Sequence, residues 1–184
     1  MTLSIIAVGK KHESWVQGGI ERYQSRLKKP YMLEWVLLPH SALADDRARE
    51  EESERILARL KSQDFVVLLD ERGDELDSPQ VSRLLDAAFT AGRQVVVTIG
   101  GAYGVDDRVH QRADVVWSLS PLVFPHQLVR LILAEQLYRA QQIAADHAGA
   151  TLVAGDGRFQ CFRGPHWESD HPGPTHPEPA RPES

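Results

Sequence analysis

The 184-residue sequence has a single cysteine, no long apolar run and no excess of basic charge. Because Cys161 has no cysteine to pair with in the chain, the sequence fits a reducing compartment. No stretch approaches the roughly 20 apolar residues that span a bilayer. The apolar start is too short for a signal peptide and lacks a small-residue cleavage site. These absences predict a cytoplasmic protein with no membrane segment.

The charge balance limits the expected partners. A formal net charge of −5 argues against a surface coated with basic side chains for nucleic acid. A local basic cluster, "ERYQSRLKK" at residues 21–29, leaves a nucleic-acid contact open, although a solvated helix face is the more common interpretation. Acidic residues are concentrated in "ADDRAREEESE" (44–54) and in the carboxy-terminal tail.

Strand and helix patterns alternate along the chain. Apolar runs predict strands over residues 3–9, 32–38, 64–73, 93–101 and 114–120. Helical spacing predicts helices over 14–27, 45–61, 79–92, 106–112 and 126–147, with Ser14 and Ser78 as caps and Pro79 at a first helical position. This alternation predicts an α/β fold with a largely parallel sheet sandwiched by helices.

The character of the sequence changes after residue 148. Residues 1–148 are expected to form one domain, and residues 149–163 are ambiguous between a strand-like extension and part of the tail. Residues 164–184 are rich in proline, histidine and acid, so they cannot bury enough apolar surface to offset chain entropy. We expect this last segment to be disordered.

A glycine turn follows the fourth predicted strand, in "VVVTIGGAYGVDD" (95–107). The spacing Gly100-Gly101-x-x-Gly104 is not the G-x-G-x-x-G of dinucleotide-binding folds, and the G-K-[ST] of a phosphate-binding Walker loop is absent. These spacings disfavour an ordinary nucleotide-binding enzyme. A purely structural tight turn remains an open alternative.

A second irregular segment, "SLSPLVFPH" (118–126), leaves the fifth predicted strand. Pro121 and Pro125 prevent regular strand or helix there, which predicts a loop with a fixed path. Two such loops at adjacent strand ends make a crevice at the carboxyl edge of a parallel sheet, where ligands commonly bind. The exposed backbone groups of these loops could recognise an adenine edge.

Four ordered segments carry a resemblance to a known family: "LLDERG" (68–73), "IGGAYGV" (99–105), "SLSPLVFPHQLVR" (118–130) and "AEQLYRA" (134–140). Together they resemble the RlmH family of SPOUT-class methyltransferases, over roughly residues 1–147. The resemblance implies a SPOUT-type fold with a carboxy-terminal trefoil knot, a homodimer, and S-adenosyl-L-methionine as cofactor. It also implies methylation of a pseudouridine, at ring N3, in 23S ribosomal RNA of the large subunit or the assembled ribosome.

The resemblance also assigns the cofactor site. It implies that the cofactor is bound by Leu69, Gly100, Leu119, Ser120, Pro121, Leu122, Val123 and Phe124. Val123 occupies a position where threonine is usual in the family, so one hydroxyl is missing from this loop.

Two charged pairs lie on the last predicted helix. The resemblance places Glu135 and Arg139 at the target base as catalytic residues, Arg139 favouring an anionic uracil ring and Glu135 orienting it; the alternative is a surface ion pair. His126 and Arg130 are candidate substrate-binding residues, the alternatives being a histidine bonded to the loop backbone and an arginine paired with a partner-chain carboxylate. The pairs fall on opposite helix faces, which favours a site shared between two subunits. No metal is expected.

The sequence departs from the family at its end. Members typically finish with a Tyr-His pair and a basic residue, whereas this chain has Gly149, Ala150 and Thr151 there. Two hypotheses therefore stand beside each other. One is an active ribosomal RNA methyltransferase, and the other is a catalytically impaired module that keeps the cofactor and RNA sites.

Overall fold

The computed structural model describes residues 2–147, which contain one five-stranded sheet. All strand pairs are parallel, in the order β2-β1-β4-β3-β5. The strands are β1 (Leu3–Val8), β2 (Leu33–Leu38), β3 (Phe65–Glu75), β4 (Val95–Ile99) and β5 (Val115–Ser118). The helices are α1 (Ser14–Gln24), α2 (Asp45–Leu57), α3 (Ser78–Thr90), α4 (Asp107–Arg112) and α5 (His126–His147).

The predicted α/β fold is confirmed. The trefoil knot stays a prediction, and the predictions for residues 149–163 and 164–184 fall outside the described residues.

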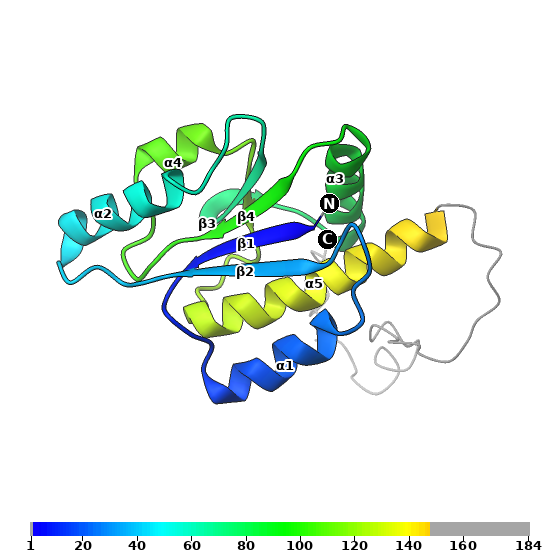
Figure 1. Cartoon of the computed structure of the whole chain (residues 1–184), viewed down its shortest axis with the longest axis horizontal. Helices are drawn as coiled ribbons and strands as arrows, with labels where there is room; N and C mark the ends of the chain where they lie inside the picture. The colour runs from blue at the N-terminus through cyan, green and yellow to red at the C-terminus, as the bar shows by residue number, and fades with distance from the viewer. Residues whose placement is uncertain (1, 148–184) are drawn as a thin grey trace, which may run out of the picture. The chain divides into compact units, whose positions relative to one another are not determined.

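Helices cover both faces of the sheet (Figure 1). On one face α1, α3 and α5 pack through a large apolar cluster that includes Ile20, Leu85 and Leu137. On the other face α2 and α4 pack through a smaller cluster that includes Ile56 and Val109. Strands buried on both faces need near-continuous apolar sequence, and β4 is buried at all five positions. This burial is why the strands could be recognised from sequence.

Two predicted caps were wrong, each by one residue. Helix α3 is capped by Asp77, whose carboxylate accepts from Gln80 N at 2.7 Å, while the Gln80 side chain accepts from Asp77 N at 2.8 Å. This reciprocal capping box leaves Ser78 free to donate to Gln136 Oε1 of α5. Ser14 is likewise the first residue of α1, and Glu13 precedes it at the cap.

Strand β3 runs two residues past its predicted end at Gly73. Its pairing with β5 shifts register between Leu69 and Asp74, so the chain bulges there and continues to Glu75. A Cβ on Gly73 would lie 2.6 Å from the backbone carbonyl carbon of Val116, so only glycine allows this close approach. The bulge turns Asp70 and its neighbours toward the carboxyl edge of the sheet.

The topology reverses between two neighbouring strands. The β1–α1–β2 connection runs toward one edge of the sheet, whereas β4–α4–β5 runs toward the other edge and uses the opposite face. In parallel sheets such a divergence marks the carboxyl edge as the usual place for a ligand. The glycine turn and the proline-containing loop both lie at this edge.

Candidate active site

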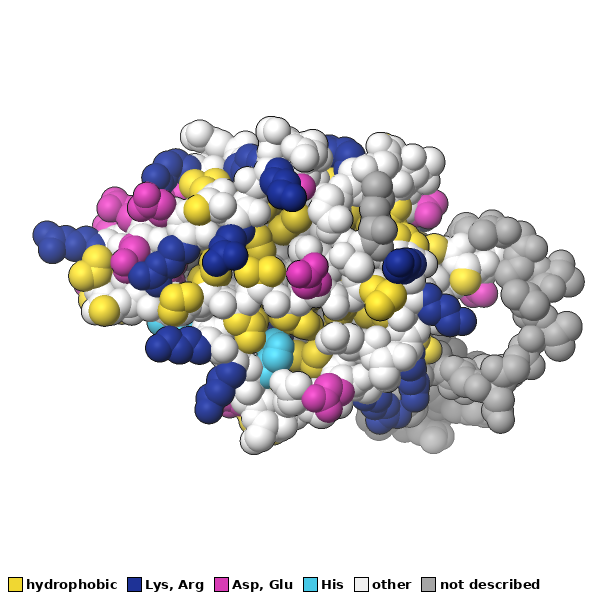
Figure 2. Space-filling view, in the orientation of Figure 1, with side chains coloured by type: hydrophobic (Ala, Val, Ile, Leu, Met, Phe, Trp, Pro, Cys, Tyr) yellow, Lys and Arg dark blue, Asp and Glu magenta, His cyan; other side chains and the backbone are white. Residues whose placement is uncertain are grey.

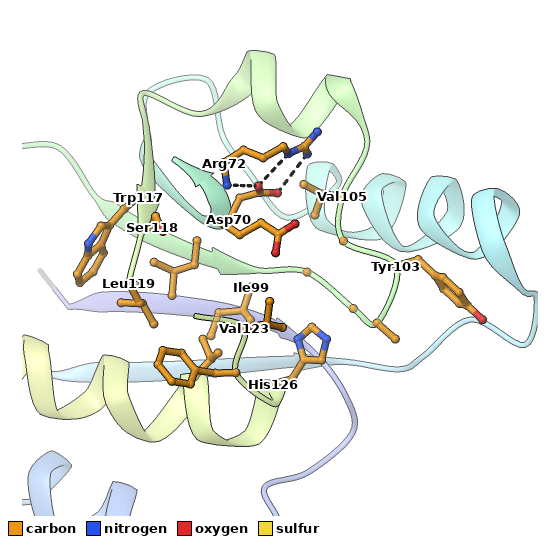
Figure 3. A pocket seen from close by; sticks show the side chains of 18 of the residues that line it. Asp70, Arg72, Ile99, Tyr103, Val105, Trp117, Ser118, Leu119, Val123 and His126 are labelled. Atoms are coloured by element: carbon orange, nitrogen blue, oxygen red, sulfur yellow. Dashed lines mark hydrogen bonds and ion pairs between the residues drawn. The ribbon is translucent and has the colours of Figure 1, made fainter. Parts of the chain in front are cut away.

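A cavity of about 510 Å³ opens at the carboxyl edge of the sheet (Figure 3). Three segments form most of its wall: residues 69–72 after the first half of β3, residues 99–105 after β4, and residues 117–124 around the end of β5. Of the eight residues predicted to bind the cofactor, seven line this cavity: Leu69, Gly100, Leu119, Ser120, Leu122, Val123 and Phe124. Pro121 is not among the lining residues. Cofactor binding by these residues stays a prediction.

The glycine turn forms one wall of the cavity. Gly104 N donates to Gly101 O at 3.0 Å, which closes a tight turn, and Gly104 has a φ of 72°. A Cβ on Gly100 would lie 2.9 Å from Cγ1 of Val105 and 3.0 Å from the Gly104 backbone. The turn therefore needs glycine at position 104 because of its positive φ, and glycine at position 100 because a Cβ has no room there.

Helix α2 supports this turn from behind. A Cβ on Gly101 would lie 2.1 Å from Oε2 of Glu52, a side chain in a residue only 4% exposed. Glu52 Oε1 accepts from Ser41 N at 2.9 Å, and Ser53 Oγ accepts from Asp106 N at 2.9 Å. Glu52 and Ser53, which are adjacent on α2, therefore lie against the two ends of the glycine turn, at Gly101 and at Asp106.

Sequence reasoning missed Glu52, because it lies in the acidic run "ADDRAREEESE" (44–54) of a predicted helix, where no single carboxylate stands out. A signal was nevertheless present. Ala48, Glu52 and Ile56 are spaced by four residues and therefore share one face of α2, and all three are buried. An acidic residue in line with two apolar residues at helical spacing indicates a buried carboxylate.

The loop after β5 holds its path through serine hydroxyls. Ser118 Oγ donates to Ser120 O at 3.1 Å, and Leu122 N donates to Ser120 Oγ at 3.0 Å. The predicted irregular segment is confirmed, since residues 119–125 are neither strand nor helix. Leu122 and Val123 are 69% and 81% exposed, which is unusual for apolar side chains of their size.

An ionic cluster lies on the opposite wall. Asp70 accepts from Arg72 N at 2.9 Å and from Arg72 Nε at 3.0 Å (Figure 3). Its Oδ2 lies 3.2 Å from Nε2 of His110. Partial burial by itself raises the pKa of Asp70. The hydrogen bonds and charge of Arg72, together with His110, outweigh that effect and hold the pKa below its ordinary 3.8. Asp70 is therefore an anion at the edge of the cavity.

His126 begins α5 and lines the cavity. Partial desolvation, followed by the charges of Arg130 and His40, lowers its pKa below 6.5, although Glu52 acts in the opposite direction. The imidazole is therefore neutral at neutral pH and can accept a hydrogen bond.

Arg130, the residue paired with His126 by spacing, lies outside the cavity and is 1% exposed. Its guanidinium donates to Val8 O at 2.7 Å and to Lys11 O at 2.9 Å, which joins α5 to the end of β1. Gly9 accommodates it, because a Cβ there would lie 2.5 Å from Arg130 Nη2. These contacts support a structural role and leave Arg130 poorly placed to contact phosphate.

Glu135 and Arg139 form an ion pair further along α5, and neither lines the cavity of its own chain. Gln136 Nε2 also donates to Glu135 Oε2 at 2.6 Å. With a rise of about 1.5 Å per residue, the nine residues from His126 to Glu135 span roughly 13 Å. The structure therefore brings His126 to the predicted cofactor residues and keeps Glu135 and Arg139 apart from them.

Residues 2–147 contain no cluster of His, Cys, Asp and Glu side chains arranged to hold a metal ion. None of their helices is both long and apolar enough to cross a membrane.

Comparison with known proteins decides the family. The model of a family described as "Predicted SPOUT methyltransferase" matches residues 1–148. This chain is a SPOUT methyltransferase. Three similar proteins all bear the name "Ribosomal RNA large subunit methyltransferase H". Those of Acetivibrio thermocellus and Thioalkalivibrio sulfidiphilus are each 39% identical, over 78% and 80% of this chain and 95% and 97% of their own length. That of Geotalea daltonii is 40% identical over 85% of this chain and 97% of its own.

These similarities confirm the predicted RlmH resemblance, and this SPOUT methyltransferase belongs to that family. The match covers the sheet, all five helices and both loops of the cavity. The segment that departs from the family, at Gly149 to Thr151, lies outside the described residues.

Proposed function

We propose that this methyltransferase transfers the methyl group of S-adenosyl-L-methionine to ring N3 of a pseudouridine in 23S ribosomal RNA. The relatives' shared name supports a large-subunit ribosomal RNA substrate. The observation that carries the proposal is the cavity at the carboxyl edge of the sheet, which gathers seven of the eight predicted cofactor residues. We further propose that the enzyme acts in the cytoplasm, on the large ribosomal subunit or the assembled ribosome.

The residues present fit this cofactor. The cavity volume of about 510 Å³ suits a nucleoside-sized ligand. Leu69, Ile99 and Leu119 supply apolar surface for an adenine ring, and the backbone of the glycine turn and of residues 118–124 supplies donors and acceptors for its edge. The anionic Asp70 at the cavity edge suits hydroxyl or ammonium groups. When bound, the cofactor supplies a methyl group activated by its sulfonium.

The chain's own side chains would handle the substrate ring. A ring N–H must lose its proton, here to solvent water, before or during methylation, so a cation that favours the anionic ring lowers the barrier. Arg139 is the proposed cation, with Glu135 fixing its orientation through their ion pair. His126, neutral at the cavity, is the proposed hydrogen-bond acceptor for the substrate.

A second copy of the chain is part of this proposal. Glu135 and Arg139 do not line the cavity of their own chain. A homodimer that places α5 of one subunit at the cavity of the other would complete the site.

A second candidate function rests on a different observation. The family's Tyr-His pair is replaced by Gly149, Ala150 and Thr151. The alternative is therefore a module that binds cofactor and RNA without transferring the methyl group.

Calorimetry with S-adenosyl-L-methionine tests the cofactor site. The full-length protein should bind, and Gly101→Ala should weaken binding, because its Cβ would overlap Oε2 of the buried Glu52 and force that side chain to move against the turn. Gly18→Ala is the matched control, since a Cβ there has no neighbour within 4 Å. An unaltered affinity in Gly101→Ala would contradict the assigned wall.

Mass spectrometry of the target stem-loop tests the reaction. Ribosomes lacking the modification should gain one methyl group when incubated with protein and cofactor. Cofactor binding without any methyl transfer would favour the non-catalytic module instead.

A further inference from the structure

Exposed apolar side chains gather at the mouth of the cavity. Within residues 2–147, six large hydrophobic side chains are markedly exposed: Trp15, Met32, Leu43, Tyr103, Leu122 and Val123. Three of these, Tyr103, Leu122 and Val123, line the cavity. Such a concentration at one opening indicates a surface that is covered when the protein works.

Tyr103 is the aromatic member of this group and is 47% exposed. It lies at the tip of the glycine turn and projects outward from the cavity (Figure 3). The turn beneath it is held by the bond from Gly104 N to Gly101 O, by Glu52 behind Gly101 and by Ser53 at Asp106 N. The ring is thus presented on a supported backbone, outside the predicted cofactor contacts.

A basic side chain, Arg49 of α2, lines the same cavity as Tyr103. Its Nη2 makes an ion pair with Asp46 at 2.9 Å, and its side chain is 40% exposed. Its Nε is buried, with no hydrogen-bond partner among the described residues, so only the exposed end of the guanidinium can reach a ligand. A guanidinium carries five N–H donors, so that end keeps donors beyond the one used by Asp46.

Two further cations lie at the same edge. Lys10 and Lys11 are exposed, and the Lys11 carbonyl accepts from Gln127 and Arg130, which fixes this segment beside the start of α5. Figure 2 shows Lys and Arg side chains around the end of the molecule that carries α2, with acidic side chains of α2 among them. Cations and acidic side chains therefore alternate at the cavity end, and Arg49 is the cation of α2 that lines the cavity.

We propose that Tyr103 stacks on an RNA base next to the target nucleotide, and that Arg49 contacts the adjoining phosphate. Single-stranded RNA bases are typically held by aromatic stacking, with cations tracking the backbone. The inference rests on the proposed function, because it takes the target base to enter the same cavity.

A nucleotide matches the chemistry of Tyr103 and Arg49. The second copy proposed above lies at the cavity through its α5, whereas Tyr103 projects outward from the cavity (Figure 3). A flat base needs one ring face, and a phosphate needs one or two donors, which is what Tyr103 and Arg49 provide.

The first test measures equilibrium binding of the target rRNA stem-loop by filter binding, alongside steady-state methylation. Tyr103→Leu should weaken RNA binding and raise KM for RNA about tenfold, the order of one lost stacking contact, with kcat little changed. Tyr103→Phe keeps the ring face and should restore both values. Met32→Ala is the control, since Met32 is 43% exposed but lies away from the cavity.

The second test concerns the phosphate contact. Arg49→Gln should lower RNA affinity and reduce the slope of log affinity against log salt by about one. Arg55→Gln is the matched control: it lies on the same helix and pairs with Glu51 one turn earlier, but it does not line the cavity. An unchanged salt slope in Arg49→Gln would overturn the phosphate assignment.

Calorimetry with S-adenosyl-L-methionine and sedimentation of each variant complete the design. RNA affinity that is the same in wild type and Tyr103→Leu overturns the stacking proposal. A loss of cofactor affinity in Tyr103→Leu would also overturn it, because the ring would then belong to the cofactor site. A loss of self-association in Tyr103→Leu would overturn it as well, because a second copy of the chain would then be the occupant. Because RNA binding is measured directly, a wild-type protein that binds RNA without methylating it would contradict the proposed function and leave this inference standing.

Discussion

Two arginines on α5 have the same spacing from a polar neighbour and very different surroundings. Arg130 follows His126 by four residues, and Arg139 follows Glu135 by four residues. Arg130 is 1% exposed and donates to backbone carbonyls at the end of β1, whereas the Arg139 side chain is 25% exposed and pairs with a carboxylate. The same spacing on one helix therefore gives a buried arginine bound to backbone carbonyls in the first case and a partly exposed, ion-paired arginine in the second.

The difference follows from the helix face on which each arginine lies. The buried residues of α5 within its first four turns are Arg130, Leu133, Ala134, Leu137 and Ala140. Their spacing of three and four residues defines one stripe facing the sheet. Arg130 is the first member of that stripe, and Glu135 and Arg139 lie off it. An arginine in register with an apolar stripe is expected to be buried and satisfied by backbone oxygens.

The largest expected effect is on stability. Arg130→Met should lower the free energy of unfolding by about 3 kcal/mol, because it removes the guanidinium that donates to the Val8 and Lys11 carbonyls and leaves Lys11 O with only its longer bond from Gln127. For a chain of this size that loss lowers Tm by roughly 10 °C. Urea and thermal unfolding measure it. Arg139→Met should lower the free energy of unfolding by only about 0.5 kcal/mol. Equal losses of unfolding free energy in the two variants would show that burial does not distinguish Arg130 from Arg139.

The second effect is on catalysis, where Arg139 should matter more than Arg130. Arg139→Met should reduce the rate of methyl transfer about 100-fold, the usual order for removing one group that stabilises developing charge. Cofactor affinity and the urea midpoint should stay near the wild-type values. Arg83→Met, at an exposed position of α3, is the control. Full activity in Arg139→Met would remove Arg139 from the site.

The smallest effect is on pH dependence. Desolvation and the charge of Arg130 lower the pKa of both His12 and His126 below 6.5. The unfolded state therefore binds more protons just below pH 6.5, and stability falls as the pH drops through that window. The depressed pKa of Asp70 affects stability only below its ordinary 3.8, so it does not interfere.

Arg130→Met removes one cause of both histidine shifts and should flatten this acid-side loss. Arg139→Met should leave it as in the wild type. Urea midpoints at pH 7.5 and 5.5 measure the slope. A slope that is the same in Arg130→Met and wild type would show that Arg130 does not influence these histidines.

Much of the fold could be predicted because its signals are local. The strands are apolar runs buried on both faces, and the irregular path of residues 119–125 follows from Pro121 and Pro125. The caps were harder, because Asp77 and Ser78 are both good cap residues and only the capping box with Gln80 selects between them.

The sequence alone determined the α/β order, the two loops of the cavity and the family to which they belong. Only the tertiary structure decided that Arg130 is buried against Val8, 122 residues away, and that Glu52 of a charged helix stands behind Gly101. It also decided that Glu135 and Arg139 lie outside the cavity of their own chain. The physical reason is the separation in sequence over which each effect acts. Strand, cap and turn preferences depend on a few neighbouring residues, whereas the cost of burying a charge depends on atoms that distant segments of the chain bring to it.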